Sequence, residues 1–254
     1  RRCPMASKSM VVIPDAHACP GYDNDRFEAL GKYIARMKPD ALVSVGDFAD
    51  MPSLSQYDKK TLKAEGRRYA LDVEVTLDAQ ERLRKHIPAK LWDKMTKVIT
   101  LGNHEDRINI AANQDPHLFG TIRTTDLGFE ANGWTVIPYK DIANLYGYNI
   151  SHTFSSGNNG LPIGGVNAAR TTLLKFHDSC ISGHSHLLST AEETTAQGRR
   201  IVAFVPGNFG HLGYGAKEGW CRNTYKNWWN GVLYIDGIES GDYTHYEHRK
   251  QEAL

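Results

Sequence analysis

Side chains that can bind metal ions recur where the predicted strands end. The first strand runs into "PDAH" at residues 14–17, the second into "GDFAD" at 46–50 and the third into "GNHED" at 102–106. Two later strands run into "SH" at 151–152 and "GHSH" at 183–186. Because ligands of an α/β sheet bind at the carboxyl ends of its strands, we expect these five groups to meet in one crevice.

Each group taken singly has a simpler structural explanation. An Asp after a strand commonly caps a helix or forms a turn, and a Gly-Asn pair commonly forms a turn. A lone His is more often a hydrogen-bonded structural residue than a ligand. Five coincident strand ends favour the functional interpretation. Carboxylate, imidazole and amide oxygen together suit Mn²⁺, Fe or Zn²⁺ better than Ca²⁺ or a thiolate-bound metal.

The elements that must position these groups are short apolar strands and amphipathic helices. One helix is predicted to begin at Asp23 or Asn24 and to end near Pro39, and others span 64–86 and 167–176. Strands are predicted at 10–13, 41–45, 98–101, 134–137, 142–145, 148–151, 180–182, 188–195, 199–205 and 232–235. An α/β first half followed by a β-rich second half predicts an α/β fold of packed sheets flanked by helices.

Composition limits the protein class without naming a substrate. The chain has 254 residues, 41% hydrophobic and 23% charged, and we expect residues 1–254 to form a single domain. The net charge of +1 does not by itself demand a nucleic-acid partner. The four cysteines form no C-x-x-C pair, which favours reduced thiols in a cytoplasmic protein.

The amino-terminal residues suggest neither a signal peptide nor a membrane anchor. No apolar run approaches the roughly 18 residues of a membrane span, so no membrane partner is expected. Residues 1–4 are interpreted as an expression scar or a processed leader.

The ordered series "PDAH", "GDFAD", "GNHED", "ISH" and "GHSH" resembles the calcineurin-like metallophosphoesterase superfamily. The matching motifs extend over residues 15–186. The resemblance implies two packed mixed β-sheets flanked by α-helices, an αββα sandwich, with a two-metal site. Met51 and Leu101 stand where protein Ser/Thr phosphatases carry an arginine, which argues against a phosphoprotein phosphatase.

Carried over by position, the resemblance implies a role for each motif residue. One metal would be held by Asp15, His17, Asp47 and His186, and the other by Asp47, Asn103, His152 and His184. His104 would lie near the leaving group, and Asp50 would steady it. The two divalent ions are expected to be Mn²⁺, with Fe or Zn²⁺ as alternatives. They would generate a bridging hydroxide for attack on phosphorus, with His104 as general acid.

The charged residues that follow His104 in the third motif can be interpreted in more than one way. Glu105 and Asp106 are expected to begin a helix, where carboxylates favour the positive end of the dipole. Arg107 is expected to form an ion pair within that helix, with contact to a phosphate oxygen as the alternative.

The substrate is the least determined part of the sequence. Residues 51–70 follow the second motif and are expected to overhang the site, where Lys59 and Lys60 are candidates for substrate binding. Aromatic residues of 219–231 could stack on bases or fill a core, and the second is favoured. The first hypothesis is a phosphodiesterase or nuclease acting on nucleic acid, such as DNA, or on nucleotides. The alternatives are a phosphomonoesterase for a small metabolite or nucleotide, and a catalytically silent metal-binding scaffold.

Overall fold

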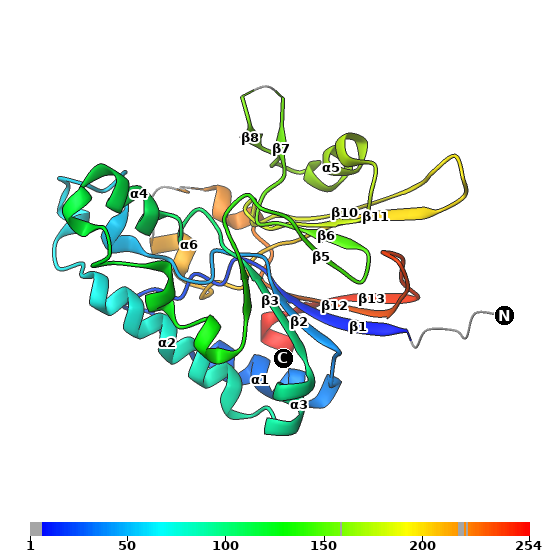
Figure 1. Ribbon diagram of the computed structural model, residues 1–254, viewed down its shortest axis with the longest axis horizontal. Coiled ribbons are helices and arrows are strands. Elements are labelled where there is room, and N and C mark those ends of the chain that lie inside the picture. The colour runs from blue at the N-terminus through cyan, green and yellow to red at the C-terminus, as the bar shows by residue number, and fades with distance from the viewer. Residues whose placement is uncertain (1–6, 158, 218–220, 222) are drawn as a thin grey trace.

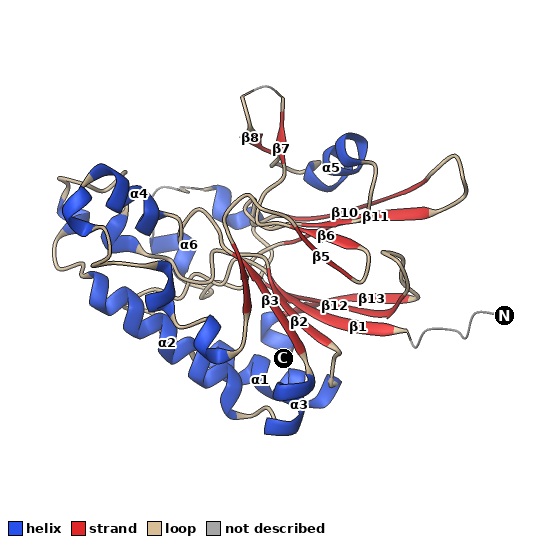
Figure 2. Ribbon diagram, viewed as in Figure 1, coloured by secondary structure: helices blue, strands red, loops and turns tan. Residues whose placement is uncertain are grey.

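The computed structural model describes residues 7–157, 159–217, 221 and 223–254. Two β-sheets face each other, and helices cover the outer face of each sheet (Figure 1, Figure 2). This is the mixed α/β sandwich that the sequence predicts. The loops that carry the five motifs gather at one end of the two sheets.

The first sheet has six strands in the order β13-β12-β1-β2-β3-β4. Four of them run parallel, namely β1 (Lys8–Ile13), β2 (Ala41–Ser44), β3 (Thr96–Thr100) and β4 (Thr135–Ile137). The strand β12 (Gly231–Ile238) pairs antiparallel with β1, and β13 (His245–Lys250) forms the edge beyond it. The parallel register places the ends of β1, β2 and β3 side by side.

The second sheet has five strands in the order β10-β11-β9-β6-β5. Its central strands β6 (Tyr148–Ile150), β9 (Cys180–Ile181) and β11 (Arg200–Pro206) are parallel. The edge strands β5 (Ala143–Leu145) and β10 (Leu188–Thr194) pair antiparallel with their neighbours. A separate hairpin is formed by β7 (Ser155–Ser156) and β8 (Leu161–Pro162). The ends of β6 and β9 therefore lie next to each other.

The alternation of side chains along β1 explains how the layers hold together. Met10 and Val12 belong to the buried cluster between the sheets, which includes Phe204 of β11. Val11 and Ile13 belong to a second cluster on the opposite face, with Phe27 of α1. Because β1 is covered on both faces, its residues Met10–Ile13 are all apolar rather than alternating.

Helices α1 (Asp25–Met37), α2 (Tyr69–Lys85) and α3 (Ala89–Lys94) lie along the outer side of the first sheet (Figure 1). Helix α5 (Ala168–Phe176) packs on β10 and β11 of the second sheet. Helices α4 (Arg107–Gln114) and α6 (Tyr214–Lys217) lie at the end where the motif loops gather. Short 3₁₀ turns occupy Pro52–Leu54, Leu62–Ala64, Pro116–Leu118, Thr124–Leu127, Glu130–Asn132, Thr224–Asn227 and Gln251–Ala253.

The helix expected at 64–86 begins later, at Tyr69. Gly66 has a left-handed backbone with φ of 74°, and Arg68 is extended, so the residues before Tyr69 cannot continue a helix. The buried side of α2 also carries polar residues. Gln80, for example, donates a hydrogen bond of 2.7 Å to the carbonyl of Leu127. Hydrogen bonding thus allows polar residues to be buried where the sequence pattern predicts only apolar ones.

The sequence pattern does not predict every element. It misses α3, α6, β7, β8 and β13, because each is short or weakly patterned. Within the described part of the chain, no helix is both long and apolar enough to cross a lipid bilayer. Residues 1–4 and Cys3 lie outside the described residues, so their interpretation stays a prediction.

Candidate metal centre

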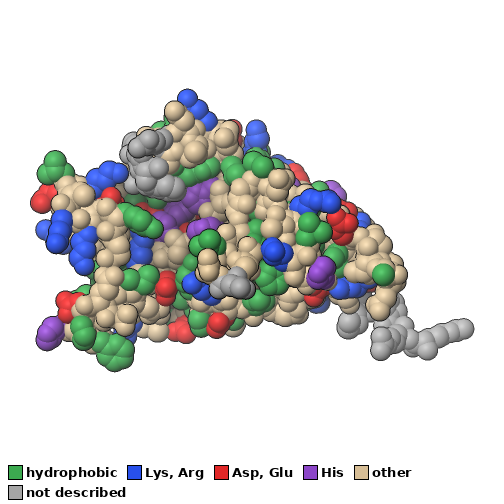
Figure 3. Space-filling model, turned by 90° about the horizontal axis from the view of Figure 1, so that it is seen from above, with side chains coloured by type: hydrophobic (Ala, Val, Ile, Leu, Met, Phe, Trp, Pro, Cys, Tyr) green, Lys and Arg blue, Asp and Glu red, His purple; other side chains and the backbone are tan. Residues whose placement is uncertain are grey.

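The five motif loops bring their polar residues to one place from two different sheets. Asp15 and His17 follow β1, Asp47 follows β2, and Asn103 follows β3. From the second sheet, His152 follows β6, and His184 and His186 follow β9. Figure 3 shows histidine side chains in a hollow of the surface. The expectation of one shared crevice therefore agrees with the geometry.

The first cluster consists of Asp15, His17 and His186, all buried, with their ligand atoms within 4.8 Å of one another. The Nε2 atoms of His17 and His186 are 3.0 Å apart, and His186 Nε2 is 3.1 Å from Asp15 Oδ2. Asp15 Oδ1 is buried and has no hydrogen-bond partner among the described residues. Converging nitrogens and an unsatisfied carboxylate oxygen fit a bound cation.

The second cluster consists of Asp47, His152 and His184, with ligand atoms again within 4.8 Å. Asn103 Oδ1 lies 3.0 Å from His152 Nε2 and 3.0 Å from His184 Nδ1. His152 Nδ1 is 2.7 Å from the carbonyl of Val45 and can donate its proton there. The lone pair of a neutral His152 then points from Nε2 toward Asp47 Oδ2, 3.3 Å away, which calls for a positive charge between them.

Without a metal ion, a proton supplies that charge. Burial favours the neutral ring, but the carboxylate of Asp47 outweighs it and raises the pKa of His152 to about 9. Burial likewise opposes ionisation of Asp47, yet the charge and hydrogen bond of His152 hold the pKa of Asp47 well below its usual range. The site thus favours a negative Asp47 facing a positive species.

Several candidate ligands have a strained backbone. His17, Asp47, His184 and His186 have φ angles of 45°, 47°, 71° and 57°, in the left-handed region that L-residues seldom adopt. Such conformations cost of order 1–3 kcal/mol each and persist where the surroundings hold them. One restraint is the hydrogen bond of 2.8 Å from His17 N to Asp47 O. The four strained positions support a functional rather than an architectural role for these loops.

Two motif glycines are explained by close approach to the carboxylates. A Cβ atom on Gly102 would lie 2.1 Å from Asp47 Oδ1. A Cβ atom on Gly183 would lie 2.1 Å from Asp15 Oδ1 and 2.9 Å from Val45 Cγ2. Any larger residue would push the carboxylates out of the site.

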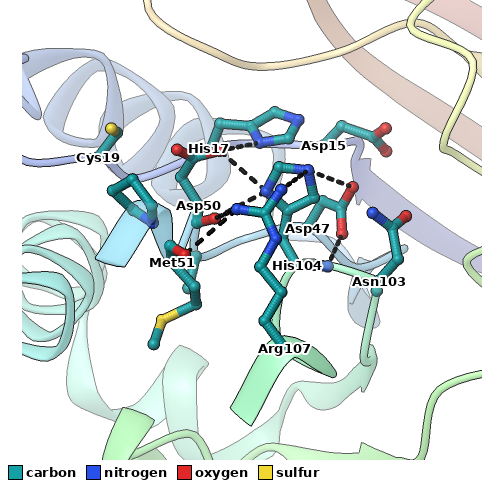
Figure 4. A network of polar contacts seen from close by, with 12 residues as sticks. Asp15, His17, Cys19, Asp47, Asp50, Met51, Asn103, His104 and Arg107 are labelled. Carbon is teal, nitrogen blue, oxygen red and sulfur yellow. Dashed lines mark hydrogen bonds and ion pairs between the residues drawn. The ribbon is translucent and has the colours of Figure 1, made fainter. Parts of the chain in front are cut away.

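The His104 side chain lies beside these clusters and is held by Asp50 (Figure 4). His104 Nδ1 is 2.9 Å from Asp50 Oδ1 and 2.7 Å from the Asp50 carbonyl. Burial and the charge of Arg107 disfavour the charged ring, but Asp47 and Asp50 outweigh them, so the pKa of His104 is raised. The same Asp50 Oδ1 is 3.0 Å from His17 Nδ1. One carboxylate therefore orients a candidate ligand and a candidate acid together.

Arg107 does not form the ion pair expected within its helix. Its Nη1 donates to the carbonyls of Asp50 at 2.8 Å and Met51 at 3.2 Å, and its Nη2 is 3.2 Å from His104 Nε2 (Figure 4). Backbone carbonyls satisfy the donors without cancelling the charge. The structure therefore places a cation beside His104, and contact of Arg107 with a phosphate oxygen stays a prediction.

Glu105 also differs from its expected role at the start of a helix. Helix α4 begins at Arg107, and Glu105 is fully buried. Its carboxylate accepts backbone hydrogen bonds from Asp47 at 3.0 Å, Ala49 at 2.8 Å and Gly102 at 2.7 Å. Burial and the neighbouring Asp47 raise the pKa of Glu105 to about 7. This side chain joins the second and third motif loops.

Tyr214 of α6 is a site residue that the sequence analysis missed. Its hydroxyl donates a hydrogen bond of 2.6 Å to Asp50 Oδ1, and its ring stacks on His17 with centroids 5.1 Å apart. Tyr214 follows none of the five motifs, so no pattern in the sequence points to it. The nearby aromatic segment at 219–231 offered an indirect signal. Gly219, Trp220 and Arg222 of that segment lie outside the described residues.

Trp228 shows how that segment contacts the site. Its ring packs edge-on against His186 with centroids 4.3 Å apart. Trp229 packs against His248 at 5.5 Å, away from the motif loops. Both tryptophans are partly buried and belong to none of the core clusters, so the interpretation that they fill a core stays a prediction.

A cavity of about 390 Å³ opens over the clusters. Its floor and walls come from motif residues, and its other side comes from residues 52–68, which we call the overhanging segment. The lining residues are Asp47, Asp50, Asn103, His104, Arg107, His184, His186 and Tyr214, with Pro52, Ser55, Tyr57, Asp58 and Arg67 of the overhanging segment. Lys59 and Lys60 are exposed and are not part of this lining.

Comparison with known proteins decides the family. The sequence model of the calcineurin-like phosphoesterases matches residues 9–188, well over half of the chain. The chain belongs to the calcineurin-like phosphoesterase family. It is also similar to the gene 54 protein of Mycobacterium phage L5, with 26% identity over 241 residues that cover 91% of this chain and 90% of that protein.

As a calcineurin-like phosphoesterase, the protein is a metal-dependent hydrolase of phosphate esters. The buried His/Asp clusters at the ends of the two sheets are the part of this phosphoesterase suited to divalent metal ions. The cavity above them is large enough for a small phosphate ester, because ligand cavities usually measure about 300–1,000 Å³.

Proposed function

We propose that the protein is a two-metal phosphodiesterase acting on nucleotides or nucleic acid. One ion would be held by Asp15, His17, Asp47 and His186, and the other by Asp47, Asn103, His152 and His184. The observation that carries the proposal is the position of Asp47. Its carboxylate lies within 4.8 Å of ligand atoms of His17 and, in a second grouping, of His152 and His184. A carboxylate between two clusters is suited to bridge two ions.

The donor types favour Mn²⁺, with Fe and Zn²⁺ as the alternatives, because carboxylate, imidazole and amide ligands suit these ions. Two such ions would neutralise phosphate oxygens and lower the pKa of a bound water toward neutrality. The protein contributes the fixed arrangement of ligands and the buried surroundings of Asp15 and Asp47.

His104 is proposed to protonate the leaving oxygen. Its ring lines the cavity, and Asp50 fixes its orientation through Nδ1, which leaves Nε2 directed away from Asp50. The raised pKa of His104 favours the protonated form that a general acid requires. Arg107, next to His104 Nε2, is proposed to bind a non-bridging phosphate oxygen.

The choice of a diester rests on the charge of the cavity wall. The guanidinium groups of Arg107 and Arg67 both line the cavity. Arg67 is paired with Asp58 at 2.7 Å, which leaves Arg107 as the stronger local positive charge. Beyond the two metal ions, Arg107 is the side-chain cation proposed to contact the phosphate, and one added cation suits a diester, which carries one negative charge fewer than a monoester dianion. The three described cysteines are buried thiols, which supports a cytoplasmic location.

A substrate panel tests this proposal. The purified protein with Mn²⁺ is offered bis-p-nitrophenyl phosphate, p-nitrophenyl phosphate, and labelled single- and double-stranded DNA. We expect faster hydrolysis of the diester than of the monoester, with cleavage of at least one DNA substrate. A preference for the monoester without DNA cleavage would indicate a phosphomonoesterase instead, and no hydrolysis at all would indicate a silent scaffold.

A further inference from the structure

The overhanging segment is held to α2 at its start and closed on itself by contacts between its own residues. At its start, Asp72 of α2 accepts hydrogen bonds from Ser53 N at 3.1 Å and Ser53 Oγ at 2.6 Å. At its end, Arg67 donates to the Pro52 carbonyl at 3.1 Å and pairs with Asp58 at 2.7 Å. These contacts close the segment on itself, so its remaining side chains project from a defined frame.

Tyr57 is the aromatic residue of this segment that lines the cavity. Its side chain is 92% exposed, although most tyrosines bury their rings at least in part. The described residues offer its ring no stacking partner and its hydroxyl no hydrogen bond. An aromatic ring kept in solvent at the mouth of a phosphate site is suited to stack on a planar group of a ligand.

A cation in the cavity that Tyr57 lines indicates what that ligand carries. Arg107 lines this cavity, together with Asp47, His184 and His186 of the candidate metal clusters. An anionic phosphate would lie over the floor, and a planar group attached to it would reach the mouth. A nucleoside joined to a phosphate has this arrangement of charge and aromatic surface.

We infer that Tyr57 is a specificity residue that stacks on a nucleobase attached to the scissile phosphate, so that the substrate class is a nucleotide ester. The inference rests on the proposed phosphodiesterase function and deepens it. Base stacking on an aromatic side chain contributes roughly 1–3 kcal/mol, which corresponds to about 5- to 150-fold in kcat/KM.

Two esters with the same leaving group isolate the contribution of the base. The first is the p-nitrophenyl ester of thymidine 5′-monophosphate, and the second is methyl p-nitrophenyl phosphate, which has no base. The quantity measured is the ratio of kcat/KM for the thymidine ester to that for the methyl ester, with Mn²⁺. We expect Tyr57→Ala to lower this ratio about 5- to 150-fold and Tyr57→Phe to keep it within about twofold.

Leu62→Ala is the matched control, because Leu62 is 93% exposed in the same segment and is not part of the cavity lining. We expect this variant to keep the wild-type ratio. An unchanged ratio in Tyr57→Ala, while the wild type hydrolyses both esters, would overturn the inference and leave the proposed function intact. Failure of the wild type to hydrolyse either ester would overturn the proposed function, and the inference with it.

Discussion

At the scale of single residues, one carboxylate oxygen of Asp50 contacts three site residues. Asp50 Oδ1 contacts His17 at 3.0 Å, His104 at 2.9 Å and the Tyr214 hydroxyl at 2.6 Å. Burial opposes its charge, yet the hydrogen bonds of His104 and His17 hold the pKa of Asp50 well below its usual range. A change at any of these residues is therefore expected to affect the others.

His104→Ala tests the proposed acid. We expect turnover to fall about 10²- to 10⁴-fold, because protonation of the leaving oxygen is lost, while metal content stays the same. Turnover is measured with Mn²⁺ on bis-p-nitrophenyl phosphate, and metal content by elemental analysis. His117→Ala is the control, since His117 is exposed and lies outside the motifs. Full turnover of His104→Ala at normal metal content would remove His104 from the mechanism.

Tyr214→Phe tests the positioning of His104 through Asp50. The ring remains to stack on His17, but the hydrogen bond to Asp50 is lost. A hydrogen bond to a charged group contributes roughly 1.5–3 kcal/mol, so we expect kcat to fall by about tenfold or more at unchanged KM. Steady-state kinetics and metal analysis check this. A change in KM with kcat within twofold of the wild type would contradict the positioning role of Tyr214.

At the scale of elements, the sheet ends and their loops set the geometry. The ends of β1, β2 and β3 are brought together by parallel pairing, and those of β6 and β9 by a separate parallel pair. After β2, β3 and β9, a Cβ atom on Gly46, Gly102 or Gly183 would lie less than 3 Å from neighbouring atoms, so glycine is required there. The position of each ligand therefore depends on backbone that lies within a few ångström of a carboxylate.

Gly183→Ala tests this packing. The added methyl group would overlap Asp15 Oδ1, so we expect metal content and activity to fall at least tenfold. Overpacking of this kind typically also costs about 1–3 kcal/mol in the free energy of unfolding. Gly164→Ala is the matched control, because a Cβ there meets nothing within 4 Å. Normal metal binding by Gly183→Ala would show that the loop can move aside.

At Asp72 of α2, a raised pKa makes the free energy of unfolding depend on pH. Burial and the charge of Asp50 raise its pKa to about 6, against hydrogen bonds from Ser53 that lower it. Because the pKa is higher in the folded than in the unfolded protein, Asp72 stabilises the fold below about pH 4, and this contribution is lost as the pH rises through about 6.

Asp72→Asn removes this titration. We expect the unfolding free energy of the variant, relative to the wild type, to increase by roughly 1–2 kcal/mol between pH 5 and pH 7.5. Urea unfolding at the two pH values measures it. Asp93→Asn, at an exposed position, controls for the loss of a carboxylate. A difference that is the same at both pH values would contradict the assignment.

Most strands and the positions of the candidate ligands could be predicted because both follow from local pattern, whereas the short strands β7 and β8 and the weakly patterned β13 could not. Apolar runs that end in Gly-Asp, Gly-Asn or Gly-His specify the position of Asp47, Asn103 and His184 without knowledge of the fold. The contacts of Glu105 and Arg107 could not be predicted in this way. They depend on where two loops approach each other, and the same residues would serve equally well in a helix.

At the scale of the whole molecule, the metal centre exists only where the two sheets meet. Asp15, Asp47 and Asn103 come from the first sheet, and His152 and His184 from the second. The cluster of Met10, Val12, Ile150 and Phe204 between the sheets holds these halves in register. That residues 1–254 form one domain stays a prediction.

The number of Mn²⁺ ions bound per chain is the sharpest test of whether Asp47 lies between two metal ions. Equilibrium dialysis of the metal-free protein against Mn²⁺, followed by elemental analysis, gives this number. We expect two ions per wild-type chain. A stoichiometry of one ion or none in catalytically active protein would contradict the two-metal centre.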